Sequence, residues 1–208
     1  MGEPVVYIID DDRSVRQAIS LFLSSAGYNV LSFSSSEEFL EQEPGEETGC
    51  IILDVNLAGK TGLELQDELI GLDYNLPIIF ITGRGNVRMS VATMKKGAVN
   101  FLEKPFNDEE LLKSVDDAVQ LSRKLLSEKS EVKRASELLS KLTPRETEIL
   151  SLLVTGMLNK QIGYDLNIAE QTVKLHRHSI FEKLGVKSLP GLVRITDIAG
   201  FKPSGRIQ

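Results

Sequence analysis

Four apolar runs in the first half of the sequence each end on polar residues that could carry out phosphoryl chemistry. These polar residues are Asp10 and Asp11 after residues 5–9, Asp54 after residues 50–53, Thr82 after residues 77–81, and Lys104 shortly after residues 99–102. Short apolar runs bounded in this way are typical of strands buried on both faces of a parallel sheet. The carboxyl ends of such strands meet at one edge, so we expect these side chains to converge.

Three converging carboxylates would repel one another, at a cost of about 4 kcal/mol per pair at ~4 Å and an effective dielectric constant near 20. A hard dication removes this repulsion, and Mg²⁺ accepts one or two carboxylates, a carbonyl and several waters. Lys104 adds a positive charge, and Thr82 adds a hydroxyl donor. The set suits an aspartate that accepts a phosphoryl group, because such transfer depends on positioning and charge neutralisation. Taken alone, Asp54 would more readily be interpreted as a turn former or helix cap at the end of its strand, and the other strand ends reverse that preference.

The elements around these residues alternate between strand and helix. Strands are expected over residues 5–9, 28–33, 50–54, 77–81 and 99–102, and helices over residues 15–26, 37–41, 63–72, 87–96 and from Asp108 onward. Asp108 is expected to be the N-cap of the last of these helices. This alternation predicts a doubly wound α/β domain with a five-stranded parallel sheet.

These stretches resemble the receiver domain of two-component response regulators, which has a flavodoxin-like fold. The matching motifs are Ile8-Ile9-Asp10-Asp11-Asp12, Ile52-Leu53-Asp54, Phe80-Ile81-Thr82-Gly83 and Lys104-Pro105-Phe106, and they span about the first 120 residues. The resemblance implies that Asp54 accepts a phosphoryl group from a sensor histidine kinase. It implies Mg²⁺ ligands from Asp11, Asp54 and the Asn56 backbone carbonyl, with Asp10 assisting through water.

The same resemblance assigns the switch residues. Thr82 and Lys104 would contact the phosphoryl oxygens, Phe101 would be the rotating aromatic residue, and the Lys104–Pro105 peptide would be cis. Asn56 and Arg84 would line the approach of water and tune the lifetime of the phosphate. The sequence departs from the usual Met-Pro-Gly after the acceptor strand, where it has Leu57-Ala58-Gly59, without losing a ligand.

Residues 123–141 contain neither glycine nor proline and predict a helical continuation rather than a flexible tether. Whether this linker is a solvated helix or faces a partner stays open. Thr143-Pro144-Arg145-Glu146 then has the pattern of a helix start with a capping box. Further helices are expected over residues 159–166 and 169–184, with a tight turn at residues 167–168, which together make a helix-turn-helix.

This second part resembles the LuxR-type DNA-binding domain of FixJ/NarL-class regulators over residues 142 to about 196. The motifs are Leu142-Thr143-Pro144-Arg145-Glu146, Asn159-Lys160-Gln161-Ile162 and Thr172-Val173-Lys174-Leu175-His176-Arg177. The resemblance implies contacts with double-stranded DNA, to base edges from Lys174, Leu175 and His178 and to phosphates from Lys160, Thr172 and Asn159, with Arg177 beside them. It also implies a fourth helix over residues 189–198 that is used for dimerisation.

Charge separates the two parts. Residues 1–122 hold 21 Asp and Glu against 9 Lys and Arg, whereas residues 123–208 hold 9 against 15. An acidic part joined to a basic part indicates two domains with different partners. We therefore expect a receiver over residues 1–122, a helical linker over 123–141, a DNA-binding domain over 142–200 and a tail over 201–208.

The single cysteine, Cys50, lies in an apolar run and is expected to be a reduced core residue of a cytoplasmic protein. No run approaches the ~18 apolar residues of a membrane span, so no membrane partner is expected. The predicted function is a phosphorylation-dependent transcriptional regulator that forms a homodimer on phosphorylation and contacts RNA polymerase, and not a turnover enzyme. Two alternatives remain: a phosphatase with an Asp-x-Asp motif, which would need an acid where Asn56 stands, and a regulator that docks on proteins instead of DNA.

Overall fold

The computed structural model describes residues 3–42, 47–72, 74, 76–83, 91 and 93–203. The chain forms two compact units, Met1–Ser127 and Glu128–Gln208. The strands of the first unit are β1 (Val5–Ile9), β2 (Asn29–Phe33), β3 (Gly49–Asp54), β4 (Ile78–Thr82) and β5 (Asn100–Glu103). Its helices include α1 (Arg13–Ser25), α2 (Ser36–Leu40), α3 (Gly62–Gly71) and the start of α5 (Asp108–Leu139). Residues 91 and 93–95 are also helical, but the rest of the helix expected over residues 87–96 lies outside the described residues.

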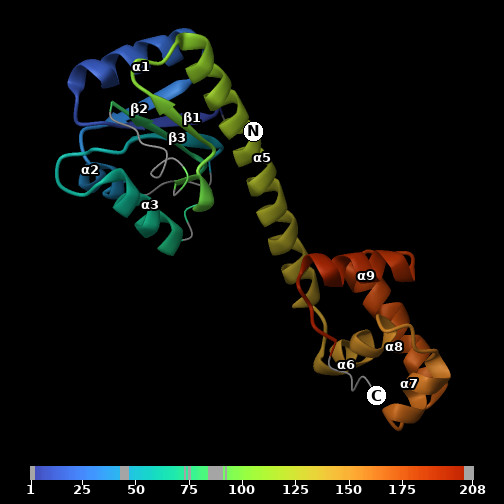
Figure 1. The fold of residues 1–208 in the computed structure, drawn as a ribbon. Coiled ribbons are helices and arrows are strands. Elements are labelled where there is room, and N and C mark those ends of the chain that lie inside the picture. The colour runs from blue at the N-terminus through green and yellow to red at the C-terminus, as the bar shows by residue number, and fades with distance from the viewer. Residues whose placement is uncertain are drawn as a thin grey trace. The chain divides into compact units, whose positions relative to one another are not determined.

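The five strands form one parallel sheet in the order β2-β1-β3-β4-β5, with helices on its two faces (Figure 1). This is the doubly wound order in which the strand sequence reverses beside β1. The expected five-stranded parallel sheet is therefore confirmed. In the register, Ile9 pairs with Leu53, and Asp54 pairs with Ile81, so the strands end close to one another.

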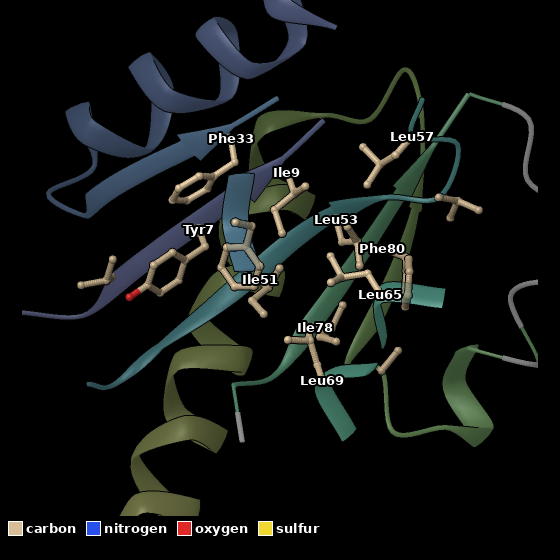
Figure 2. Packing of buried hydrophobic residues seen from close by; sticks show 14 residues of the cluster. Tyr7, Ile9, Phe33, Ile51, Leu53, Leu57, Leu65, Leu69, Ile78 and Phe80 are labelled. Atoms are coloured by element: carbon tan, nitrogen blue, oxygen red, sulfur yellow. The ribbon is translucent and has the colours of Figure 1, made fainter. Parts of the chain in front are cut away.

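Alternating side chains of the central strands fill two separate cores. Tyr7, Ile9, Ile51, Leu53 and Phe80 point to one face, where they pack with side chains of α2 and α3 (Figure 2). The residues between them, such as Ile8, Ile52 and Ile79, point to the other face against α1 and α5. Because side chains alternate along a strand, this parity also decides which polar residues share a face beyond the strand ends. Cys50 is buried in the second core, as expected.

Helix α5 begins one residue away from its expected cap. The side-chain oxygen of Asn107, and not that of Asp108, accepts a hydrogen bond from the backbone N–H of Glu110 at 2.7 Å. Asp108 is instead the first helical residue, where a carboxylate is stabilised by the helix dipole. The helix continues without a break to Leu139, so the expected helical extension of residues 123–141 is present over most of its length.

The second unit contains the helices α6 (Pro144–Leu153), α7 (Asn159–Asp165), α8 (Glu170–Leu184) and α9 (Leu189–Ile198). The capping box of Thr143 and Glu146 is formed, and the α7–α8 turn passes through Asn167 with a positive φ of 51°. This turn confirms the expected helix-turn-helix, although α8 begins at Glu170 with Ala169 as an N-cap that makes no side-chain hydrogen bond. Phe201, the first residue of the expected tail, packs against the core of this unit.

A buried carboxylate ties α6 to α8. Glu146 Oε1 accepts a hydrogen bond from Ser179 at 2.7 Å, and its Oε2 lies 2.6 Å from Lys183 Nζ and accepts the Thr143 N–H at 2.8 Å. Burial alone would raise the pKa of Glu146, but the hydrogen bonds from Lys183, Ser179 and Thr143 outweigh it and lower the pKa to about 2. One ionised side chain therefore joins α6 to α8, in addition to the apolar contacts that the two helices share.

Replacing Glu146 with glutamine should lower the free energy of unfolding of this unit by about 2 kcal/mol, because Lys183 loses its buried counter-charge. The ordinary pKa is 4.5, and the folded value lies below it. The stabilisation is therefore complete above pH 4.5 and is lost as the pH falls towards 2. Hydrogen exchange of α6 and α8 amides in a urea series would measure both effects.

Glu148 provides the matched control, since its side chain is exposed and pairs with Arg145 one turn away on α6. Glu148→Gln should change the free energy of unfolding by less than about 0.5 kcal/mol. Equal destabilisation by the two substitutions would contradict a structural role for Glu146. The difference in the free energy of unfolding between Glu146→Gln and the wild type should shrink at pH 3. A difference that stays unchanged at pH 3 would contradict the role of the ionised carboxylate.

Candidate functional site

Asp10 follows β1, and Asp54 is the last residue of β3, so both lie at the carboxyl edge of the sheet. By alternation they point to the α1 and α5 side, on the same face as Ile8 and Ile52. Asp10 is fully buried and Asp54 is 5% exposed. The fixed register of β1 and β3 thus places two buried carboxylates beside each other, which is the convergence expected from the sequence.

Lys104 is the counter-charge of both carboxylates. Its Nζ lies 2.6 Å from Asp10 Oδ2 and 2.9 Å from Asp54 Oδ1. The backbone N–H of Lys104 donates to the Thr82 carbonyl at 2.8 Å, so the end of β4 holds the lysine in place, and its peptide bond to Pro105 is cis as expected. The lysine side chain is 22% exposed, which leaves the ammonium accessible from one side.

The pKa values of this cluster reflect burial and shared charge. Burial raises the pKa of Asp10, and the nearby charge of Asp54 adds to this, while hydrogen bonds from Lys104 and Asp12 offset only part of it. Burial alone would lower the pKa of Lys104, but its hydrogen bonds to the two carboxylates outweigh it and raise the pKa. Lys104 therefore remains a cation throughout the physiological pH range.

Asn56 and Thr82 lie at the edge of the same cluster. The backbone N–H of Asn56 donates to Asp54 Oδ2 at 2.9 Å, and its side-chain amide donates to the buried Thr82 hydroxyl at 3.2 Å. Phe101 lies on β5 next to β4 and is half-buried against the core formed by α2 and α3. Arg84, the other residue expected to line the approach of water, lies outside the described residues.

Asp11 and Asp12 do not join the buried pair. Asp11 is exposed, and Asp12 caps α1 by accepting the Ser14 N–H at 2.7 Å. Within the described part of the chain, no three Asp, Glu, His or Cys side chains are grouped closely enough to form a metal centre by themselves. Any cation bound at this edge would need backbone and water oxygens in addition to carboxylates.

Two supporting residues were missed by the reasoning from sequence. The Arg16 guanidinium donates to the Asp10 carbonyl at 2.5 Å, which anchors the end of β1 to α1. Gly62 begins α3 next to the end of β3, where a Cβ atom would lie 2.3 Å from the Asp54 carbonyl oxygen and 3.1 Å from Leu53 Cγ. A glycine at the first position of a helix with a good capping box was the available signal, because glycine is a poor helix former.

A second candidate surface lies on α8 in the other unit. Lys174 and His178 have side chains that are 53% and 77% exposed, and Leu175 between them is 65% exposed. Val173 and Ile180 on the opposite side are fully buried in the core. Helix α8 therefore exposes Lys174, Leu175 and His178 on the side away from the core.

The remaining residues that are expected to contact DNA lie on α7 and α8 and differ in how far they are exposed to solvent. Lys160 is exposed on α7, while Asn159 and Thr172 are half-buried. Arg177 is partly committed to the fold, since it donates to Asn159 Oδ1 at 3.2 Å and its guanidinium lies 5.4 Å from the centroid of the Phe181 ring. The pair of Arg177 and Asn159 links α8 to the start of α7, so both sides of the helix-turn-helix contribute to one surface.

Two family models match the two units. Residues 6–116 match the response regulator receiver domain, and residues 140–196 match the bacterial regulatory proteins of the luxR family. A receiver fold with a buried acidic cluster, followed by a helix-turn-helix, defines the class of response regulators that act on DNA. The chain belongs to this family, whose members join a receiver to a LuxR-type DNA-binding domain and regulate transcription in response to phosphorylation.

Similar proteins share both units. Transcriptional regulatory protein FixJ of Rhizobium meliloti is 38% identical over 207 residues, covering 98% of this chain and all of that protein. Nodulation protein W of Bradyrhizobium diazoefficiens is 40% identical, with 94% and 86% of the two chains covered. Among solved structures, the response regulator StyR is 41% identical with a TM-score of 0.84, covering 94% of this chain and 99% of its own.

A receiver implies a sensor kinase as partner, and a LuxR-type domain implies DNA. The family consists of transcription factors and not enzymes. A search of the helices in the described residues found none with the length and apolar character needed to cross a membrane.

Gly62→Ala should destabilise the receiver by about 1–3 kcal/mol and slow phosphorylation, because the added methyl group must push the Asp54 backbone or α3 aside. Gly71→Ala is the matched control, since it lies on the same helix and a Cβ there meets nothing within 4 Å. It should leave both properties unchanged or slightly improved. Thermal unfolding and phosphorylation rates with acetyl phosphate would compare the two, and equal effects would contradict the close approach at Gly62.

Proposed function

We propose that Asp54 accepts the phosphoryl group from a sensor histidine kinase, and that this event controls DNA binding by the LuxR-type domain. The observation that carries the proposal is the geometry of Asp54, whose nearly buried carboxylate ends β3 with the Lys104 ammonium 2.9 Å from Oδ1. Asp10 shares the same lysine, so the carboxylate of Asp54 is held in place before any phosphoryl donor arrives.

In the transfer, an Asp54 oxygen forms a bond to phosphorus while the bond from phosphorus to the donor histidine nitrogen breaks, and the imidazole leaves with the electron pair. Lys104 and the Thr82 hydroxyl balance the charge that spreads over the phosphoryl oxygens. A phosphatase with an Asp-x-Asp motif needs an acid as general base two residues after the nucleophile, and this position holds Asn56. Asp54 therefore keeps its phosphoryl group and loses it slowly, so the protein does not turn over many substrate molecules.

The donor set suits Mg²⁺. Asp10, Asp11 and Asp54 against Lys104 leave a local charge of about −2, and their carboxylate oxygens are the ligands that a hard dication prefers. Asp11, Asp54 and the Asn56 carbonyl would hold the ion directly, with Asp10 assisting through water. When bound, the ion neutralises the carboxylates and the incoming phosphoryl oxygens.

The switch begins at Thr82. Its hydroxyl accepts a hydrogen bond from the Asn56 amide and can turn its own O–H toward a phosphoryl oxygen on Asp54. Phe101, half-buried on the adjacent strand, rotates in response, and the surface of the last strand changes. The receiver then supports a homodimer, which brings two DNA-binding domains to paired half-sites.

The DNA interface comprises Lys174, Leu175 and His178 as base readers and Lys160, Thr172 and Asn159 as phosphate contacts, with Arg177 beside them. Helix α9 contributes to dimerisation, and RNA polymerase is the further partner. The receiver domain covers residues 1–122, and the DNA-binding domain covers residues 142–200. Residues 123–141 form the linker between them, and residues 201–208 form the tail. The family consists of bacterial regulatory proteins, and bacterial DNA lies in the cytoplasm, so the protein acts there.

Asp54→Asn should abolish phosphorylation by acetyl phosphate with Mg²⁺, because the amide is a far weaker nucleophile than the carboxylate. Wild-type protein should gain one phosphoryl group per chain, dimerise and bind selected DNA more tightly. Intact-mass spectrometry, sedimentation and DNA titration would record these three results. Asp117→Asn, which removes an exposed carboxylate from α5, should behave as wild type. Equal dimerisation and DNA occupancy in Asp54→Asn and wild type would rule out the phosphorylation switch.

The DNA contacts divide into two kinds that salt titration can separate. Lys160→Ala should weaken binding to all sequences alike and reduce the slope of log K against log salt by about 0.9, because one phosphate contact is lost. Lys174→Ala should cost about 1–3 kcal/mol on the selected site and relax the preference at one base pair. Lys202→Ala, in an exposed position after α9, should change neither. A salt-independent affinity would favour docking on protein.

A further inference from the structure

Two carboxylates stand among the exposed residues of α8 that are proposed to meet DNA. Glu170 Oε1 lies 3.0 Å from Lys174 Nζ, and Glu182 Oε1 lies 3.6 Å from His178 Nε2, each pair being one helical turn apart. The side chains of these pairs are 45–77% exposed. A carboxylate on a surface that meets DNA repels the phosphates and lowers the affinity, unless it makes a favourable contact of its own in the complex.

Glu170 is the better placed of the two acids. It is the first residue of α8, and the N-terminal residues of a recognition helix are those that reach base edges. The preceding N-cap residue, Ala169, has no side chain that could hydrogen-bond with the first turn, and the helix dipole there stabilises a charged carboxylate. Glu182 lies three turns further along, beyond the proposed base readers.

We propose that Glu170 is a specificity-determining residue of the DNA interface, which holds Lys174 in an ion pair on non-matching DNA and accepts a hydrogen bond from a cytosine amino group in the matching site. This inference rests on the proposed base-reading role of Lys174.

The physical basis is an exchange of partners. On DNA without the right bases, Lys174 remains paired with Glu170, its charge is not available to phosphates, and the carboxylate repels the DNA. On the matching site, Lys174 contacts the O6 and N7 acceptors of guanine, and the released carboxylate accepts from the N4 amino group of cytosine. Separating the ion pair leaves both Lys174 and Glu170 in need of a partner on the DNA. Only a site that offers both guanine and cytosine supplies them, so the two contacts together distinguish matching from non-matching DNA more strongly than either contact alone.

Glu170→Gln in the full-length chain, treated with acetyl phosphate and Mg²⁺, tests this directly. Affinity for random-sequence DNA should rise about 5- to 10-fold, and the slope of log K against log salt should steepen by about 0.9, because Lys174 is free to contact a phosphate. Selection from randomised DNA should yield the wild-type motif with one column per half-site relaxed, and that column should carry cytosine in the wild-type motif.

Two comparisons separate this role from a simple change in net charge. Glu148→Gln removes the same charge from α6, in a pair that does not involve α8, and should change affinity for random DNA by less than about twofold. In a Lys174→Met background, Glu170→Gln should no longer raise that affinity, since the two residues act as a coupled pair. An equal rise in both backgrounds would overturn the proposal, as would loss of a column that is not cytosine.

Failure of this inference can be told apart from failure of the proposed function. If the wild type selects a motif and Glu170→Gln selects it with the same discrimination, only the assignment of Glu170 is overturned. If the wild type shows neither sequence preference nor salt dependence, DNA reading by α8 is overturned and Glu170 loses its role with it. Matching thermal midpoints of wild type and variant would show that α8 remains folded in the comparison.

Discussion

The receiver unit depends on one cation shared by two buried carboxylates. Asp10 and Asp54 are almost completely removed from water, and each would pay several kcal/mol for its charge without Lys104 between them. The three residues come from the ends of β1 and β3 and from the position just after β5, so the cluster exists only while these strands keep their register. The tight packing of alternate apolar side chains on both faces supplies that constraint.

The DNA-binding unit uses the same principle with the roles reversed. There, a single buried carboxylate, Glu146, collects hydrogen bonds from Lys183, Ser179 and Thr143 and so joins α6 to α8. On the exposed side of α8 the ion pairs are open to water and therefore weak, as in the pair of Glu170 and Lys174. Buried charges fix the orientation of the helix, whereas exposed charges can exchange partners when DNA arrives.

Much of this arrangement could be predicted from the sequence, because the strands are continuous apolar runs and their polar ends must meet at one edge of a parallel sheet. The convergence of Asp10, Asp54 and Lys104 followed from that geometry alone. The expected cap of α5 was wrong by one residue, since Asn107 and Asp108 have nearly equal capping propensities and the structure uses Asn107. The glycine at the first position of α3 signals a constraint at Gly62, but its cause, the close approach to the Asp54 carbonyl, depends on tertiary contacts. The roles of the individual site residues stay predictions.

Charge counting explains why phosphorylation at this position would be felt beyond it. An acyl phosphate on Asp54 would replace one negative charge with about −1.5 to −2, while Lys104 still supplies a single positive charge to Asp54 and Asp10 together. The surplus would have to be met by other donors nearby, and the buried Thr82 hydroxyl, which contacts the Asn56 amide, is one of them. Because Thr82 ends β4 and its carbonyl accepts the Lys104 N–H, any movement of Thr82 would also be felt at the ends of β4 and β5. Because one lysine serves two carboxylates, negative charge added to Asp54 would leave the cluster with charge that Lys104 alone does not neutralise.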